Sequence, residues 1–387
     1  MRQSFQRSPK DGIMTMLRIY LDYNASTPID PAVVAAMRPF IADHYGNPSS
    51  GHWAAKTALE TARDQVAALL GCQNDEIVFT SGGSEANNLA LKGVFFTFRD
   101  KGDHIITTQI EHPAIIEPCR FLERLGAQVT YLPVDGTGRI DPDDLRKAIT
   151  PRTILVSIMQ ANNEVGTIQP IADCARLAHE HGAVFHTDAA QSVGKVPTSV
   201  NELGIDLLSI AGHKVYAPKG VGVLFVRRGV SLEPLIHGAG HESGRRAGTE
   251  CALLAVGLGK ACELARDLGP MDHVCSLRDH FWREMQKQFG NHVVLNGHPA
   301  LRLPNTLNVS FVGRIGAEIL ERLDGVAAST GSACHSGCIE LSPVLKAMSI
   351  APEVGMGAVR FSLGRTTTRD EIDTVVERLT NILATAG

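Results

Sequence analysis

The sequence lacks the features that mark several classes of protein. No apolar run approaches the roughly 18 residues that a membrane-spanning helix needs, since residues 251–259 are followed at once by Lys260. The net charge is −4 with a pI near 6.4, and no basic stripe stands out, so no direct nucleic-acid partner is expected. Eight cysteines in 387 residues do not indicate a disulfide scaffold. The first residues do not resemble a signal peptide, and we therefore expect reduced thiols and a cytoplasmic location.

The composition that remains is that of a folded chain. Hydrophobic residues make up 44% and charged residues 20%, a balance that excludes wholesale disorder. At about 100–200 residues per domain the length predicts two or three domains, and large α/β units would favour two. Residues 1–16 are polar and without pattern, and they are interpreted as a disordered extension or an over-long start.

Strand-like and helix-like segments alternate from residue 17 to about residue 226. This alternation predicts an α/β fold with a mostly parallel sheet and helices on both faces. A last strand at 221–226 follows its predecessor so closely that we expect the two to be antiparallel. The expected strands are 18–22, 76–79, 104–107, 128–132, 153–158, 183–186, 205–210 and 221–226, and the expected helices are 84–92, 114–125 and 172–181.

The pattern changes after about residue 263. A long charged helix at 271–289 is followed by strands at 306–311 and 358–363 and by helices at 317–323 and 369–384. We interpret residues 17–262 as a large domain and residues 263–387 as a smaller α+β domain.

Three segments carry candidate chemistry, and each is weak by itself. The segment Thr80-Ser81-Gly82-Gly83-Ser84-Glu85-Ala86-Asn87-Asn88 stands where a strand turns into a helix. Its free backbone N–H groups and the Ser84 hydroxyl could bind a phosphate, although a plain capped turn explains it equally well. Asp188 follows a buried strand, where open α/β sheets bind ligands, but an Asp that caps the next helix is the commoner case. Lys214, in Gly212-His213-Lys214, follows another buried strand, and partial burial would favour the neutral amine that attacks an aldehyde.

Taken together, the three segments are much stronger evidence for a cofactor site than any one of them alone. A phosphate cradle, an Asp and a later Lys are the groups that hold pyridoxal phosphate. The lysine forms a Schiff base with the cofactor, and the Asp keeps the pyridine nitrogen protonated so that the ring accepts electrons.

The sequence resembles the class V, fold-type I pyridoxal-phosphate enzymes, and within them the cysteine desulfurases, with some similarity to selenocysteine lyases. The matching segments cover nearly everything after residue 17; they are 21–28, 77–92, 160–166, 186–194, 212–222, 244–249, 331–334 and 359–368. The resemblance implies a large cofactor-binding domain, whose opening stretch packs with the small domain, and a small C-terminal domain that carries a catalytic cysteine loop.

The resemblance also implies roles for individual residues. Lys214 would form the Schiff base, and Cys334 would be the nucleophile that takes the substrate sulfur as a persulfide while alanine is released. His112 would stack on the cofactor ring and transfer protons. Asn163 and Arg360 would bind the substrate carboxylate, whereas Arg365 is interpreted as structural. The cofactor-binding residues would be Gly83, Ser84, His112, Asn163, Asp188, Gln191, His213, Lys214 and Thr249.

Further expectations concern partners. Thr249 would reach the cofactor phosphate of a neighbouring subunit, which implies a homodimer. A sulfur-acceptor protein, as in iron–sulfur assembly, is the expected macromolecular partner.

Two departures from the family pattern affect these roles. Ala211 stands where many bacterial desulfurases have a phosphate-binding Ser, and the chain stops at Gly387 without the longer tail that docks a scaffold.

Alternatives to this interpretation remain open. A selenocysteine lyase shares the fold and the cofactor. These residues do not decide whether the substrate is cysteine or selenocysteine. A class V aminotransferase would leave the Cys334 loop without a purpose, and a non-catalytic interaction protein would not need Lys214, Asp188 and His112 together. A zinc site at Cys334, His335 and Cys338 lacks the usual ligand spacing, so no metal is expected.

Overall fold

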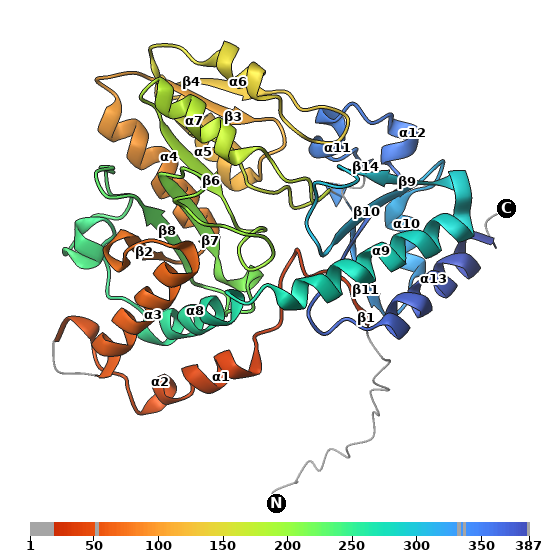
Figure 1. Ribbon diagram of the computed structural model, residues 1–387, viewed down its shortest axis with the longest axis horizontal. Coiled ribbons are helices and arrows are strands. Elements are labelled where there is room, and N and C mark those ends of the chain that lie inside the picture. The colour runs from red at the N-terminus through yellow and green to blue at the C-terminus, as the bar shows by residue number, and fades with distance from the viewer. Residues whose placement is uncertain (1–18, 51–53, 331–333, 336–337, 385–387) are drawn as a thin grey trace, which may run out of the picture.

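The computed structural model describes residues 19–50, 54–330, 334–335 and 338–384, and of residues 334–335 and 338–339 it describes the backbone only. The extension predicted over residues 1–16 lies outside this described part. Figure 1 shows two regions side by side, each built on its own sheet, with β2 to β8 in one and β9, β10 and the C-terminal helices in the other.

The larger sheet has seven strands and is mostly parallel, which confirms the predicted α/β class. Its strands from β7 to β4 run parallel, whereas β8 is antiparallel to both of its neighbours, as its closeness to β7 predicts. In spatial order the strands are β2 (Ile77–Thr80), β8 (Gly222–Val226), β7 (Leu207–Ala211), β6 (Val184–Asp188), β5 (Thr153–Ser157), β3 (His104–Thr108) and β4 (Gln128–Leu132).

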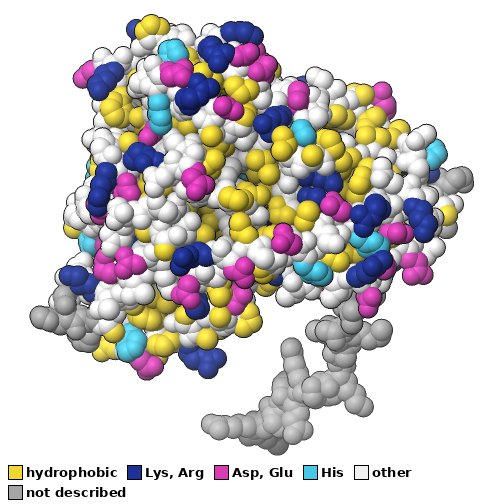
Figure 2. All heavy atoms as spheres, in the orientation of Figure 1, with side chains coloured by type: hydrophobic (Ala, Val, Ile, Leu, Met, Phe, Trp, Pro, Cys, Tyr) yellow, Lys and Arg dark blue, Asp and Glu magenta, His cyan; other side chains and the backbone are white. Residues whose placement is uncertain are grey.

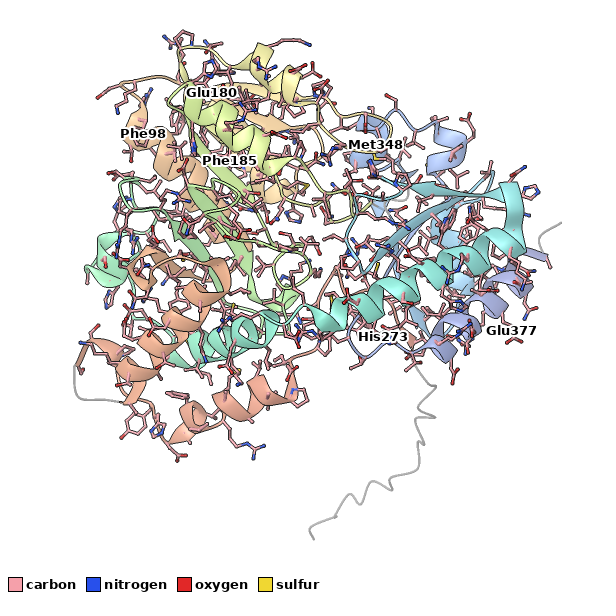
Figure 3. All side chains as sticks on the ribbon, in the orientation of Figure 1. Phe98, Glu180, Phe185, His273, Met348 and Glu377 are labelled. Carbon is pink, nitrogen blue, oxygen red and sulfur yellow. The ribbon has the colours of Figure 1, made fainter. Side chains whose placement is uncertain are left out.

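Both faces of this sheet are buried, because alternate residues of each strand join different hydrophobic clusters. Val223 and Phe225 of β8 pack into one cluster, whereas Leu224 of the same strand packs into the other. The first cluster includes side chains of α3 (Ala54–Leu70), α7 (Ile171–Glu180) and α8 (Ala252–Ala265). The second includes side chains of α4 (Gly83–Phe98) and α5 (Pro113–Glu123). Figure 3 labels Phe185, a fully buried residue of β6.

The smaller sheet has four antiparallel strands and a separate hydrophobic cluster. Its spatial order is β12 (Ser329–Thr330), β15 (Ala358–Ser362), β10 (Thr306–Phe311) and β9 (Val293–Asn296). The helices α9 (Gly269–Phe289), α10 (Gly316–Arg322) and α13 (Arg369–Ala384) contribute to this cluster. Within it the rings of Phe281 and Phe361 lie 5.0 Å apart between centroids.

The first described residues belong with this smaller sheet. β1 (Ile19–Tyr20) pairs in parallel with β11 (Val326–Ala327), and Ile19 and Leu21 are buried in the cluster formed with α9 and α13. The chain then enters the larger region. Asn24, which follows β1, therefore lies at the junction of the two regions. The domain boundary at residues 262 and 263 stays a prediction.

Short elements complete the chain. They are α1 (Pro31–Met37), α2 (Pro39–Ala42), α6 (Pro142–Ala148), α11 (Pro343–Ala347), α12 (Pro352–Gly355), the strands β13 (Cys334–His335) and β14 (Cys338–Ile339), and the 3₁₀ turns η1 (Pro48–Ser50), η2 (Asn74–Glu76), η3 (Gly212–Lys214), η4 (His241–Gly244) and η5 (Gly290–His292). In the face drawn in Figure 2, charges of both signs are interspersed and hydrophobic side chains gather near the junction of the two regions. Of the helices that the structure describes, none has the length and apolar character needed to cross a bilayer.

Candidate functional site

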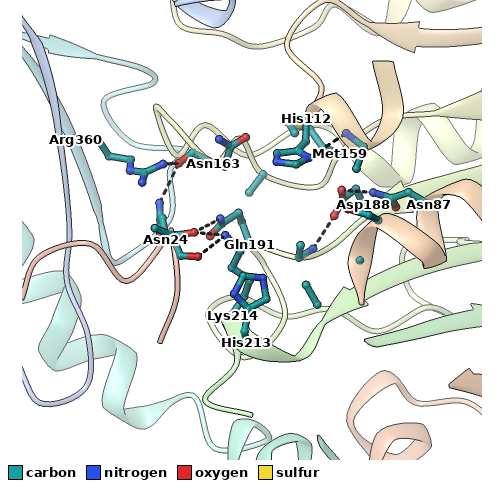
Figure 4. Close-up of a pocket in the computed structure, with 17 residues that line it drawn as sticks. Asn24, Asn87, His112, Met159, Asn163, Asp188, Gln191, His213, Lys214 and Arg360 are labelled. Atoms are coloured by element: carbon teal, nitrogen blue, oxygen red, sulfur yellow. Dashed lines mark hydrogen bonds between the residues drawn. The ribbon is translucent and has the colours of Figure 1, made fainter. Parts of the chain in front are cut away.

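A cavity of about 390 Å³ lies at the junction of the two regions, and it collects most of the residues that the sequence singles out. Figure 4 shows these residues converging from both sheets. The cavity is lined by Asn24, Ala25, Gly83, Ser84, Asn87, His112, Ala114, Met159, Ala161, Asn163, Asp188, Ala190, Gln191, Ala211, His213, Lys214 and Arg360. β6 and β7 end at this cavity and α4 begins there, which is where open α/β sheets place their ligands.

Lys214 enters the cavity from η3, immediately after the buried strand β7. Its Nζ donates hydrogen bonds to the backbone oxygens of Asn24 and Ala25, the latter at 3.0 Å. Burial, assisted by the positive charge of Arg360, lowers the pKa of Lys214 to about 8, although Asp188 and Asp22 act in the opposite direction. A substantial fraction of the amine is therefore neutral near physiological pH and able to attack a carbonyl carbon.

Asp188 is the last residue of β6, and both of its carboxylate oxygens are held by hydrogen bonds. Asn87 of α4 donates from Nδ2 to Oδ2 at 2.7 Å, and the backbone N–H of Ala190 donates to Oδ1 at 2.9 Å. These two bonds fix the direction of the carboxylate toward the cavity that it lines. Asn87 lies in the candidate segment 80–88, one helical turn after Gly83, but its role in holding Asp188 was not anticipated from the sequence.

His112 presents a neutral imidazole to the cavity. It caps α5, and its Nδ1 accepts a hydrogen bond from the backbone N–H of Ala114 at 3.1 Å. Burial lowers the pKa of His112, with Asp188 acting against this shift and Lys214 adding to it. Because Nδ1 is an acceptor, the proton of the neutral ring stands on Nε2. Nε2 is thus the atom that can exchange a proton with a ligand.

The N-terminus of α4 forms another wall of the cavity. The first N–H groups of a helix have no partner within the helix, so the backbone at Gly83 and Ser84 can bind an anion. A Cβ placed on Gly83 would lie 3.2 Å from the Cβ of Ala211, so the glycine permits the close approach of α4 to β7. Since Ala211 ends in a methyl group, it offers no donor of its own. The neighbouring His213 stays neutral because burial and the charges of Lys214 and Lys219 lower its pKa to about 4.

Arg360 reaches the cavity from β15 of the smaller sheet. Its Nη2 pairs with Asp22 Oδ1 at 2.7 Å, and its Nη1 donates to the backbone oxygen of Asn163 at 3.0 Å. Its buried Nε has no hydrogen-bond partner in the described part of the chain. A guanidinium held in one orientation at a cavity wall is suited to a planar carboxylate.

The chain is similar to proteins of one family over nearly its whole length. The class-V aminotransferase model matches residues 19–375. "Cysteine desulfurase IscS" of Dictyoglomus turgidum is 50% identical over 374 residues, covering 94% of both chains. "Cysteine desulfurase" of Homo sapiens is 45% identical over 368 residues, covering 93% of this chain and 80% of that protein.

This chain belongs to the cysteine desulfurase family.

Solved structures of related proteins have the same fold. A "NifS-like protein" superposes with a TM-score of 0.89 at 38% identity, covering 95% of this chain and 100% of that one. A structure titled "SspA in complex with cysteine" superposes with a TM-score of 0.81 at 38% identity, covering 90% of this chain and 100% of that one. The class-V fold of the cysteine desulfurases, expected from the resemblance, is thereby confirmed.

Two of the expected site residues do not belong to the described cavity. Thr249 is exposed in the segment after η4 and is not among the lining residues, so its role toward a second subunit stays a prediction. The backbone of Cys334 pairs with Ile339 between β13 and β14, but its side chain lies outside the described part of the structure. The side chains of His335 and Cys338, the alternative zinc ligands, also lie outside the described part.

Asn24 is a residue of this desulfurase-family site that sequence reasoning missed. Its backbone oxygen accepts hydrogen bonds from Lys214 Nζ and from Gln191 Nε2, the latter at 2.9 Å. Its side chain donates to Thr306 Oγ1 at 2.8 Å and accepts from Asn305 Nδ2 at 2.9 Å, both in the smaller region. Asn24 therefore joins the two regions at the cavity. It lies within the matched segment 21–28, which was the available signal.

Proposed function

We propose that this protein is a pyridoxal-phosphate-dependent cysteine desulfurase, which transfers the sulfur of L-cysteine to Cys334 as a persulfide and releases L-alanine. The observation that carries the proposal is the presence of Lys214, Asp188 and Arg360 around one cavity. Curated cysteine desulfurases that are 45–50% identical to the chain support the same reaction.

The residues of the cavity fit pyridoxal phosphate. Lys214 supplies an amine of lowered pKa for the aldehyde, and Asp188 supplies a fixed carboxylate for the pyridine nitrogen. The N-terminus of α4 at Gly83 and Ser84, with His213, suits the phosphate group. When bound, this cofactor supplies an electron sink that labilises bonds at the substrate carbons.

Gln191 and Asn163 complete the proposed cofactor contacts. Gln191 lines the cavity, and its amide nitrogen, which donates to the backbone oxygen of Asn24 at the cavity wall, would also serve as the partner of the ring hydroxyl. Asn163 also lines the cavity, and its backbone oxygen binds Arg360, so one residue would serve both the cofactor and the substrate.

Arg360 would bind the carboxylate of L-cysteine. Because Arg360 and Lys214 line the same cavity, a carboxylate bound to Arg360 would leave the amino group of the substrate close to the cofactor. His112 would exchange protons with the substrate through Nε2, because its Nδ1 is engaged by the helix that it caps.

Cys334 would accept the sulfur. Its thiolate forms a bond to the substrate sulfur while the bond from that sulfur to carbon breaks. The carbon keeps the electron pair and takes a proton, which yields alanine, and Cys334 keeps the transferred sulfur as a persulfide.

The proposal is tested by cofactor trapping together with product analysis. Borohydride added to the reconstituted protein should attach the cofactor to Lys214, as mapped by peptide mass spectrometry, with buried Lys195 as the internal comparison. Sulfide and selenide release should then be measured side by side from cysteine and selenocysteine. A label on another lysine would refute the cofactor site, and release from selenocysteine alone would identify a selenocysteine lyase.

The active unit would be a homodimer in the cytoplasm, serving a sulfur-acceptor protein. Thr249 would contact the phosphate in the neighbouring subunit, so inactive Lys214→Ala and Thr249→Ala chains should regain activity when they are mixed. A mixture that stays inactive although heterodimers form would exclude a shared site.

A further inference from the structure

Lys195 is a buried lysine close to the cavity that the proposed reaction does not use. It is not one of the lining residues of the cavity, and only 8% of its surface is exposed. Its Nζ lies 2.9 Å from Gln191 Oε1 and 3.5 Å from Asn24 Oδ1. A buried lysine is costly unless it is bound in this way, so the position calls for an explanation.

The turn after β6 brings Lys195 back to Gln191. Residues 190–195 form consecutive turns, in which Gly194 has φ +72°, and a Cβ at that position would lie 2.9 Å from the Cβ of Ala265. The glycine thus allows the turn to close beneath α8 while Lys195 and Gln191 come together. No other acceptor than the Gln191 and Asn24 oxygens is within hydrogen-bond reach of Nζ in the described structure.

The chemistry of the two groups fixes the orientation of the amide. Lys195 Nζ carries N–H groups in either protonation state and donates one to Gln191 Oε1, so the oxygen of Gln191 faces Lys195 and the NH₂ group faces away. The NH₂ group indeed donates to the backbone oxygen of Asn24, the same oxygen that accepts from Lys214. Reversing the amide would place two donors against each other at Lys195 and two acceptors against each other at Asn24.

We infer that Lys195 is a positioning residue that holds the Gln191 amide with its NH₂ group toward the cavity, so that a bound pyridoxal phosphate meets a donor at its ring oxygen. This inference rests on the proposed function, because it concerns the same cofactor. It assigns no contact between Lys195 and the cofactor. Burial lowers the pKa of Lys195 to about 7, and the positive charges of Lys214 and Arg360 add to this shift.

The test is the pH dependence of the visible absorption band of the reconstituted protein. A hydrogen-bond donor at the ring oxygen draws negative charge from that oxygen. The oxygen then holds the neighbouring imine proton less strongly, and the pKa of the imine falls. Lys195→Met removes the amine at nearly equal size, which suits a buried position. We expect the midpoint of the absorbance titration to rise by about one pH unit, together with weaker cofactor retention on gel filtration.

A double-mutant cycle separates positioning from the charge of Lys195 itself. If Lys195 acts through the amide, Lys195→Met should cause no further shift in a Gln191→Leu background. The same shift in both backgrounds would show direct action of the charge and overturn the inference, as would an unchanged midpoint in Lys195→Met alone. Exposed Lys147→Met is the matched control and should titrate as the wild type does. A wild-type protein that takes up no cofactor would refute the proposed function first, and the role of Lys195 with it.

Discussion

The guanidinium of Arg360 holds the carboxylate of Asp22 at 2.7 Å, from Nη2 to Oδ1, across the junction of the two regions. Both side chains are mostly buried, so the pair fixes Arg360 on one side and leaves its other face to the cavity. The residue proposed to bind the substrate carboxylate is thus oriented before substrate arrives, which lowers the cost of binding.

Arg360→Lys should raise the KM for cysteine about 10- to 100-fold with a smaller effect on kcat, because a lysine cannot pair with Asp22 and a second carboxylate in the same planar geometry. Steady-state kinetics of sulfide release measure this split. Arg365→Lys is the control, since Arg365 stacks on Tyr216, with its guanidinium carbon 4.5 Å from the ring centre, and does not line the cavity. An unchanged KM in Arg360→Lys would remove Arg360 from substrate binding.

Cys334→Ala should retain the cofactor and lose nearly all turnover of cysteine. Lys214, Asp188 and Arg360 are untouched by this change, whereas the loss of the nucleophile should cost on the order of a thousandfold or more in rate. Mass spectrometry of the wild type after brief exposure to cysteine should find one added sulfur on the peptide that carries Cys334. Cys338→Ala is the neighbouring control, and an added sulfur on Cys338 instead would transfer the assignment to that residue.

The lowered pKa of Lys214 predicts how cofactor uptake depends on pH. Only the neutral amine attacks the aldehyde, so the rate at which the apoprotein takes up pyridoxal phosphate should rise with pH and level off above about 8. Stopped-flow absorbance measures this rate. Arg360→Gln removes a positive charge that lowers the pKa of Lys214, so it should move the plateau to higher pH. A wild-type rate that still rises steeply above pH 9 would contradict the prediction.

Glu242→Gln should destabilise the fold by about 3–5 kcal/mol, because it breaks a buried ion pair and leaves Arg63 uncompensated. Arg63 donates to both carboxylate oxygens of Glu242 at 2.8 and 2.9 Å, and the backbone N–H of Phe79 donates to one of them at 2.9 Å. Urea unfolding measures the change in free energy of unfolding. The exposed pair of Arg228 and Asp75 is the control, since Asp75→Asn should produce little change.

The sequence predicts those features of the site that depend on local pattern. Asp188 and Lys214 each follow a buried strand, and Gly83 begins a helix, so sheet topology alone brings them to one edge. Arg360 was anticipated only through the family resemblance, because its strand belongs to another sheet. The predicted strands of the larger sheet are observed, but β9 of the smaller sheet was missed. This strand, Val293–Asn296, is short and only partly buried, so its hydrophobic pattern is weak.

The hydrogen bonds that orient the site could not be predicted from the sequence. Three residues orient the site through hydrogen bonds to other residues of the cavity wall, and the sequence does not show these bonds. They are Asn87, Asn24 and Lys195. Nothing in a run of residues indicates that one backbone oxygen, that of Asn24, receives both Lys214 and Gln191. Such convergence is decided by the packing of the two regions against each other.

The placement of the first strand has a consequence for the order of folding. Residues that follow β1 bind β15, since the backbone N–H of Asn24 donates to Oγ of Ser362, the last residue of β15, across 338 positions of the chain. The strand β1 itself pairs with β11, so a chain made from its N-terminus keeps β1 unpaired until Val326 and Ala327 have been synthesised. Contacts of such sequence separation form late and slowly. The junction that orients Arg360 for a carboxylate should therefore form late in folding, after the seven-stranded sheet has formed.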